Sequence, residues 1–148
     1  MRYIQTIVIL HVLASSAFAC QCEVIAEPNK AFEHSSAIFV GRICGLRKEN
    51  DSVNIGSSAY NIQVSVVTFC VEQSWKGVEG NSFDILSDYS SCDYNFEING
   101  RYLVYAESDS LLKGRSYASK CFPIKKAEEA AEDIHILDGL KDGVSPKR

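Results

Sequence analysis

The stretch YNIQVSVVTFCVEQSW, residues 60–75, determines the fold class that this sequence indicates. It is rich in β-branched and aromatic residues, which are enriched in strands. Apolar residues occupy alternate positions as far as Val66, and the alternation then continues one position later from Val67. A period of two predicts a half-buried strand, and the slip of one position predicts a β-bulge near Val66. Lys76-Gly77 ends the run.

Shorter stretches with strand-like composition lie on both sides of this run. We expect them to form strands at residues 37–46, 82–88, 101–108 and 117–122. Asn99-Gly100 is a strong turn signal just before the third of these. A polar segment, residues 47–58, is expected to separate the first strand from residues 60–75.

Two helical segments flank the strands. Residues 28–36 are expected to hold one or two turns that begin near Pro28. Residues 127–139 carry apolar side chains at helical spacing, with Gly139 as the expected stop. The acid pairs Glu128-Glu129 and Glu132-Asp133 are expected to be solvated. This pattern predicts a mainly β fold with flanking helices, in the form of a small closed or partly open barrel.

A register for the two longest strands follows if Cys44 and Cys70 are assumed to face each other in an antiparallel pair. Apolar residues then share one face, and Arg42 lies opposite Glu72 on the other, as a pair of opposite charge. The remaining opposed pairs are Phe39 with Trp75, Ile43 with Val71, Gly45 with Phe69, and Ile55 with Ala59, around a tip of Gly56-Ser57-Ser58. This sorting of polar from apolar residues supports the assumed pair.

The first 19 residues have the composition of a secretory signal peptide. Arg2 precedes a short apolar run, and Ala17 and Ala19 form a small-x-small cleavage site. The run is too short for a membrane anchor, which needs roughly 20 apolar residues. A lipoprotein signal with a lipid on Cys20 fits less well, because the bulky Phe18 stands at the −2 position. We therefore expect residues 1–19 to be removed and the mature chain to be secreted, or periplasmic or surface-bound in a bacterium, with no membrane span.

The mature chain is acidic, which limits its partners. The full sequence has 15 Lys and Arg against 19 Asp and Glu, and Arg2 leaves with the signal peptide, so 14 basic residues remain against 19 acidic ones. The basic clusters Lys125-Lys126 and Lys147-Arg148 are too small for a nucleic-acid surface, so no nucleic acid is expected as a partner.

An even number of cysteines in an exported chain predicts disulfides, with the pairing left open. The six cysteines all follow the expected cleavage site: Cys20, Cys22, Cys44, Cys70, Cys92 and Cys121. A metal site is disfavoured, because there is no Cys-x-x-Cys motif and only Cys20 and Cys22 are close in sequence. We expect no metal or cofactor of the protein's own. Asn50-Asp51-Ser52 is a glycosylation sequon if the source is eukaryotic.

Cys20-Gln21-Cys22, directly after the expected cleavage site, resembles the mature start of the tissue inhibitors of metalloproteinases (TIMPs). Residues 37–42 resemble the first strand of that family's N-terminal, netrin-like domain, and residues 71–77 and 100–105 resemble strands of small TIMP-like secreted proteins. The resemblance covers residues 20 to about 137. It implies a five-stranded OB-fold barrel at residues 20–140, followed by a flexible tail at residues 141–148.

The resemblance also implies how the cysteines pair. Carried over from the family, the disulfides are Cys20–Cys92 and Cys22–Cys121, which leaves Cys44 with Cys70. The sequence departs from the family in three ways. It has no counterpart of the C-terminal subdomain, no cysteine between residues 28 and 36, and Glu23-Val24-Ile25 in place of the family's usual segment.

In TIMPs, the mature N-terminal amine and the carbonyl of the first cysteine chelate the catalytic zinc of the target protease. The resemblance therefore implies that Cys20 chelates the zinc of a metalloproteinase. It further implies that Gln21, Cys22 and Glu23 contact the target, with Gln21 in its primary specificity pocket. An α-amine with a pKa of roughly 7.7–8.0 has a neutral fraction near pH 7, and a catalytic zinc keeps an open position for it.

The sequence is also compatible with a second function. In this alternative, Cys20 and Cys22 only fasten the N-terminus to the rest of the fold, and the chain is a secreted, monomeric interaction module without inhibitory activity. An enzyme is not expected, since the sequence has no HExxH, GxSxG or SxxK motif. His34 and His135 are expected at the surface. The aromatic residues expected in the core and at its rim are Tyr89, Tyr94, Phe96, Tyr102 and Tyr105.

Overall fold

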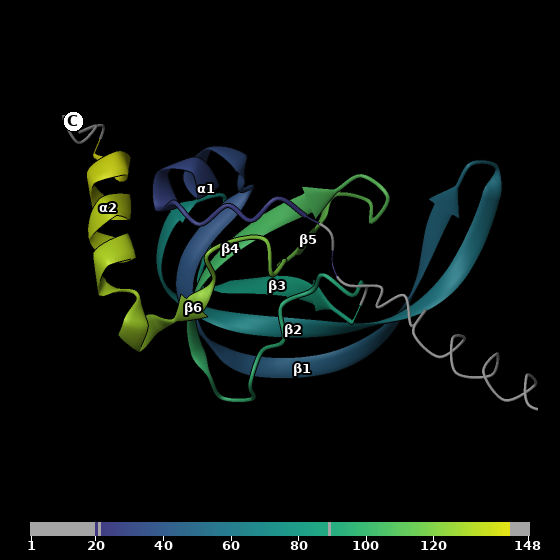
Figure 1. Cartoon of the computed structure of the whole chain (residues 1–148). Coiled ribbons are helices and arrows are strands. Elements are labelled where there is room, and N and C mark those ends of the chain that lie inside the picture. The colour runs from purple at the N-terminus through teal and green to yellow at the C-terminus, as the bar shows by residue number, and fades with distance from the viewer. Residues whose placement is uncertain (1–19, 21, 89, 143–148) are drawn as a thin grey trace, which may run out of the picture.

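The structure is a computed structural model that describes residue 20, residues 22–88 and residues 90–142 (Figure 1). The expected signal peptide, Gln21, Tyr89 and residues 143–148 of the expected tail lie outside this part of the chain. The elements in chain order are α1 (Pro28–His34), β1 (Ala37–Ile55), β2 (Ser58–Lys76), β3 (Ser82–Ser87), β4 (Arg101–Asp109), β5 (Arg115–Tyr117), β6 (Lys125–Lys126), the 3-10 turn η2 (Ala127–Glu129) and α2 (Ala131–Lys141).

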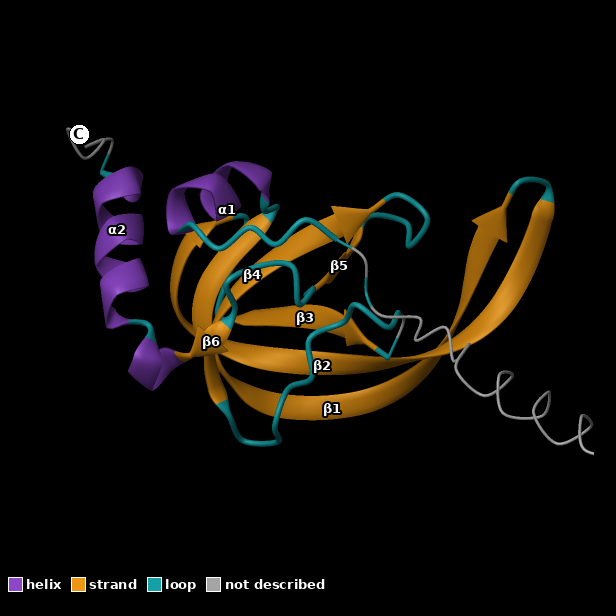
Figure 2. Cartoon of the chain, in the orientation of Figure 1, coloured by secondary structure: helices purple, strands orange, loops and turns teal. Residues whose placement is uncertain are grey.

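The sheet closes on itself because β1 pairs with two strands. It runs antiparallel to β2 along most of its length, and its residues 37–42 also pair with residues 101–106 of β4. The sheet order is β1-β2-β3-β5-β4-β6, so the β1–β4 pairing joins five strands in a hydrogen-bonded ring and leaves β6 attached to β4. The β3–β5 pairing is parallel. The helices α1 and α2 lie together beside the ring (Figure 2). The predicted mainly β fold with flanking helices and disulfides is confirmed.

The main core fills the ring. Residues 102–106 of β4 are all 1 % exposed or less, because this strand contacts helices as well as its neighbouring strands. The Phe69 ring lies edge-on to Phe39 and to Phe96, with centroids 5.3 and 5.1 Å apart. Phe96 and Tyr94 are half-buried and come from the loop between β3 and β4. Aromatic side chains therefore occupy the core and its rim, as predicted for those that the structure describes.

A second apolar cluster explains the slip in alternation at Val66 and Val67. Val67 belongs to the main core, whereas Val66 packs with Leu86 and Leu112 in a separate cluster. Alternate residues of a strand point to opposite faces, so β2 is buried on both faces at this point. The pairing of residues 64–68 with β1 is regular, and the predicted bulge near Val66 is therefore wrong.

The irregularities lie elsewhere in the β1–β2 pairing. The register shifts between Ile38 and Phe39, between Val40 and Gly41, and between Ile43 and Gly45 leave Trp75 and Glu72 of β2 and Cys44 of β1 with no residue opposite them. A bulge bends the strand that carries the extra residue, so both β1 and β2 bend in this region. The predicted register is therefore wrong, although the Cys44–Cys70 disulfide forms. The observed pairs are Phe39 with Ser74, Arg42 with Cys70, Ile43 with Phe69, Gly45 with Thr68 and Ile55 with Ser58.

Three further expectations about strands change. Glu72 accepts a 2.7 Å hydrogen bond from Arg101 instead of facing Arg42. The polar residues 47–55 continue β1, and the hairpin tip is Gly56-Ser57. Most of the strand expected at residues 117–122 does not form, because β5 ends at Tyr117 and the following residues turn towards the N-terminal segment.

The C-terminal helix also differs from expectation. Asp133 is only 7 % exposed, and its carboxylate lies 3.0 Å from the Lys125 ammonium, so this acid is not solvated. Helix α2 continues past Gly139, since Lys141 donates a hydrogen bond to the carbonyl of Ser74 and fastens the last turn to β2. In the part of the chain that the structure describes, no helix is long and apolar enough to cross a membrane.

The outer halves of β1 and β2 form an arm, residues 47–64, that extends beyond the ring at the right of Figure 2. A chain of ion pairs fastens it to the β4–β5 turn and to β3. Arg115 bonds Asp51 at 2.8 Å and Glu49 at 2.9 Å, and Lys113 bonds Asp51 at 2.8 Å. Arg47 links Glu49 to Asp84. The pKa of Asp51 lies well below its usual range, chiefly because Lys113 donates to it, with further donation from the Ser52 backbone and Arg115.

Asp51→Asn should lower stability by about 1 kcal/mol at neutral pH, because it removes two partly exposed ion pairs. A carboxylate with a depressed folded pKa stabilises the protein above its ordinary pKa near 4 and loses this effect as the pH falls below it. The variant should therefore show a flatter loss of stability below about pH 4 in urea titrations. Glu27→Gln is the control, since Glu27 pairs only with Lys30 at an exposed site. Equal pH profiles for Asp51→Asn and the wild type would contradict the role of the ion pairs.

Gly77→Ala should destabilise the protein more than Gly80→Ala. Both glycines have positive φ, at 65° and 83°, where a Cβ costs roughly 1–2 kcal/mol. At Gly77 the added Cβ would also overlap the backbone carbonyl of Ser36, whereas at Gly80 it meets no atom within 4 Å. Chemical denaturation of both variants tests the difference, and equal losses would show that the β2 end can move away from Ser36.

Candidate functional site

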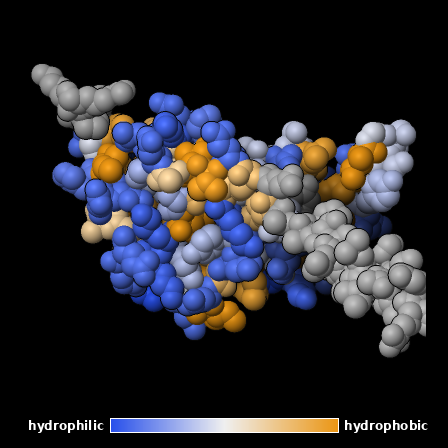
Figure 3. Space-filling model, viewed as in Figure 1, coloured by the Kyte–Doolittle hydropathy of each residue, from blue (hydrophilic) through white to orange (hydrophobic). Residues whose placement is uncertain are grey.

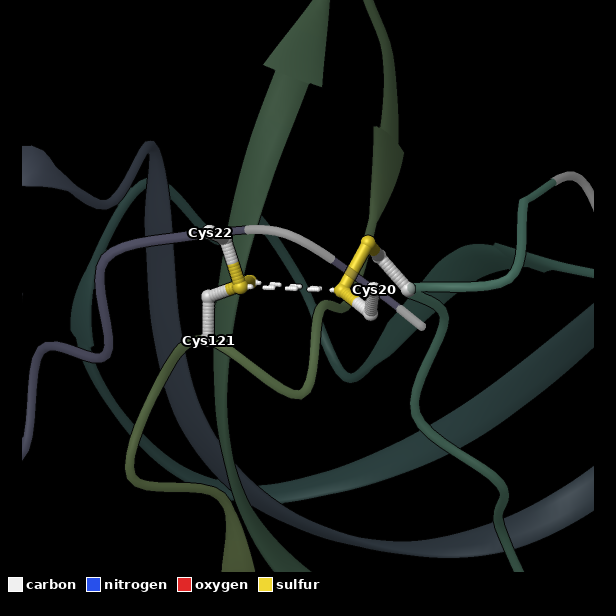
Figure 4. A group of neighbouring side chains, drawn as sticks. Cys20, Cys22 and Cys121 are labelled. Atoms are coloured by element: carbon white, nitrogen blue, oxygen red, sulfur yellow. Dashed lines mark hydrogen bonds between the residues drawn. A yellow bond between two sulfur atoms is a disulfide. The ribbon is translucent and has the colours of Figure 1, made fainter. Parts of the chain in front are cut away.

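Two disulfides fasten the start of the described chain to two distant loops (Figure 4). Cys20 is bonded to Cys92 in the β3–β4 loop, with their Cα atoms 4.9 Å apart. Cys22 is bonded to Cys121 in the β5–β6 connection, with their Cα atoms 6.0 Å apart. With Cys44–Cys70, these are the three pairings that the sequence resemblance implies. Three disulfides are also consistent with an extracellular protein.

The two N-terminal disulfides lie against each other. The sulfur of Cys20 is 3.6 Å from that of Cys22 and 3.9 Å from that of Cys121, the contacts that are dashed in Figure 4. All four sulfur atoms lie within 4.8 Å of one another. The structure thus brings together four cysteines from three chain segments, which their spacing in the sequence did not indicate.

Backbone hydrogen bonds join the same three segments. The amide of Ile25 donates to the carbonyl of Cys121 at 2.7 Å, and the amide of Lys120 donates to the carbonyl of Cys92 at 2.8 Å. Asp93 and Ser119 form an isolated β-bridge beside them. The N-terminal segment is therefore held by main-chain contacts as well as by sulfur.

Past the disulfides, the chain forms an exposed ridge, residues 22–24. Cys22 and Glu23 are exposed and Val24 is 67 % exposed, whereas Ile25 packs against the main core. Cys20 is half-buried behind the ridge, and Gln21 lies outside the described residues. Of the residues expected to contact a target, Cys22 and Glu23 are therefore at the surface and rigidly supported.

A groove of about 390 Å³ adjoins the ridge. It combines carboxylates with apolar and sulfur surface, and its lining residues are Cys22, Glu23, Ile25, His34, Ser90, Cys92, Glu107, Asp109, Tyr117, Ser119, Cys121 and Phe122. Burial and a hydrogen bond to Glu107 raise the pKa of Tyr117, so its hydroxyl stays protonated at neutral pH. Because the carboxyl groups of Glu23, Glu107 and Asp109 line it, the groove is acidic.

Most groove residues had no signal in the sequence. Glu107 and Asp109 are separated from Glu23 by more than half of the chain, and only the closure of the ring brings them together. His34 was expected on the surface of the first helix, which is correct, but its position beside the groove could not be foreseen.

No protein-family model and no curated protein matches this chain. Its function therefore has to be inferred from the arrangement of its own residues. The feature to be explained is an exposed N-terminal ridge that two disulfides hold beside an acidic groove.

Peptide mapping without reduction should recover Cys20–Cys92, Cys22–Cys121 and Cys44–Cys70. Cys20 and Cys22 stay on one peptide, so partial reduction and stepwise alkylation are needed to tell them apart. The most informative competitor is the exchanged pairing, Cys20–Cys121 with Cys22–Cys92, because the sulfurs of Cys20 and Cys121 are only 3.9 Å apart. Recovery of that pairing would overturn the described path of the N-terminal segment.

Proposed function

We propose that this chain is a secreted inhibitor of zinc metalloproteinases, similar to the N-terminal domain of TIMPs, with an OB-fold barrel. A ring of five strands in which β5 lies between β3 and β4 supports this fold, since the OB-fold is a five-stranded Greek-key barrel. The removal of residues 1–19 by signal peptidase would leave Cys20 as the first residue. The proposal includes no catalytic activity and no cofactor of the chain's own.

The observation that carries the proposal is the double anchoring of the ridge. Cys20 and Cys22 are bonded to separate loops, and the Ile25 amide is bonded to Cys121. A segment fixed at three points loses little conformational entropy when it binds. Such a segment suits an inhibitor that inserts an N-terminus into the cleft of a protease.

The chemistry of Cys20 follows from its position at the mature N-terminus. Its neutral α-amine and its carbonyl oxygen would form a five-membered chelate with a zinc ion and displace the zinc-bound water. Zinc binding favours the deprotonated amine, so affinity rises with pH through the amine's ordinary pKa of roughly 7.7–8.0. Gln21 would enter the specificity pocket, and Cys22 and Glu23 would contact the rim of the cleft.

One extra residue before Cys20 tests this mechanism. It moves the amine by roughly 3.3–3.6 Å, which is longer than a zinc–nitrogen bond of about 2.0–2.1 Å. The extended protein should keep its three disulfides and its melting temperature but lose inhibition of matrix-type metalloproteinases by orders of magnitude. A residue added after Arg148 is the matched control and should leave inhibition unchanged. Gln21→Gly should weaken inhibition less than the extension.

The alternative is a secreted interaction module without inhibitory activity. The arm favours it, because Ile55 and Tyr60 near its tip are 63 % and 53 % exposed. On the face drawn in Figure 3, hydrophobic patches lie among mainly hydrophilic residues. If correctly processed wild-type protein inhibits no zinc endopeptidase at micromolar concentration, the inhibitor proposal is refuted and the interaction module remains.

A further inference from the structure

Four cysteine sulfurs lie in one cluster beside the ridge, and together they match the ligand set of a soft metal ion. We propose that Cys20, Cys22, Cys92 and Cys121, once reduced, form a four-thiolate site that binds one Zn²⁺ ion. The site goes beyond the proposed inhibitor function, which uses the amine and carbonyl of Cys20 and a zinc ion that belongs to the target. It uses the side chains of this chain and a metal ion of its own.

Two of the distances between sulfurs of different disulfides already match the edge of a four-thiolate tetrahedron. A zinc–sulfur bond of about 2.3 Å gives edges of about 3.8 Å between the sulfurs of a four-thiolate site. The Cys20 sulfur lies 3.6 Å from Cys22 and 3.9 Å from Cys121, and all four sulfurs lie within 4.8 Å. The sulfurs of the two bonded pairs have to move apart, and reduction of the disulfides permits this.

The backbone keeps the cluster together without the disulfides. The Ile25–Cys121 and Lys120–Cys92 hydrogen bonds join the three segments that carry the four cysteines. Ser119 and Ser90 accept hydrogen bonds from the amides of Cys121 and Cys92, each at 3.1 Å, and so fix the backbone at two of the ligands. These hydrogen bonds involve no sulfur atom, so they are available to hold the four thiols near one point when the disulfides are reduced.

A cation can reach the cluster through the acidic groove. Cys22 is exposed, and Cys22, Cys92 and Cys121 all line the groove. Glu23, Glu107 and Asp109 line it as well, and their negative charge raises the local concentration of divalent cations. The fourth ligand, Cys20, is half-buried behind them.

The chemistry balances with an external reductant, either a dithiol or a phosphine. Each disulfide takes up two electrons and two protons and becomes two thiols, while a dithiol becomes a disulfide or a phosphine becomes its oxide. Binding of one Zn²⁺ by the four thiols then releases four protons, because thiolates are the ligands. Affinity should therefore rise with pH, and reoxidation should expel the metal.

The test is a Co²⁺ titration of the full chain after anaerobic reduction with a phosphine and removal of the phosphine. Tetrahedral Co²⁺–thiolate sites give intense visible ligand-field bands and near-ultraviolet charge-transfer bands. We expect these bands to saturate at one Co²⁺ per chain and to vanish when Zn²⁺ is added, because Zn²⁺ binds such sites more tightly. The oxidised chain should give no such bands. Absence of the bands from the reduced wild-type chain would overturn the proposal.

Two double variants distinguish metal binding at the proposed cluster from metal binding by any four thiols of an unfolded chain. Cys44→Ser with Cys70→Ser keeps the cluster and should retain the bands at one equivalent. Cys22→Ser with Cys121→Ser also keeps four cysteines but removes two ligands of the cluster, so the bands should be lost. Equal binding by both variants would refute the site. The inhibition assay on oxidised protein is independent of this outcome, so either proposal can fail alone.

Discussion

The structure depends on the double pairing of β1. Over residues 38–42 this strand is paired with β2 on one edge and with β4 on the other. Neither edge is then open to solvent, and the five strands can enclose the main core, while the second apolar cluster packs against the other face of β2. The extra residues Trp75 and Glu72 of β2 and Cys44 of β1 bend the two strands where the ring closes. Closure also brings the β3–β4 loop and the residues after β5 to the same place, where they receive the N-terminal segment.

Disulfides and main-chain hydrogen bonds together hold that segment in place. The loops closed by Cys20–Cys92 and Cys22–Cys121 span 72 and 99 residues, and in the chain-entropy model each disulfide contributes about 4–5 kcal/mol. This stabilisation alone is a sufficient reason for both cysteines. Disulfides with a purely structural role do not require the chain next to them to be exposed. Because Cys22, Glu23 and Val24 are exposed, we propose a binding role for the ridge.

Alternation predicted the class of the fold and most of the strands, because it is a local signal. The disulfide pairs were implied by the resemblance that starts at Cys20-Gln21-Cys22, since the sequence alone leaves the pairing open. The predictions from the sequence failed where a residue contacts partners that are distant in the sequence. The slip at Val66 and Val67 came from two cores on opposite faces of β2, which a single strand pattern cannot distinguish from a bulge. Asp133 looked solvated because Lys125, which pairs with it, belongs to another element. The groove was missed because its carboxylates meet only through ring closure.

The arm has a consequence for the behaviour of the protein in concentrated solution. Over residues 47–55 and 58–64 each strand pairs only with the other in the described part of the chain, so both outer edges can accept a further strand. Unpaired edges of this kind are where proteins join edge to edge and aggregate. Arg47, Glu49 and Asp51 place charged groups at alternate positions of β1 in the arm, and charged side chains at such strands oppose pairing with a second copy. Because salt screens charges at the surface, this protection weakens as ionic strength rises, and edge-to-edge association of the arm becomes more favourable at high salt.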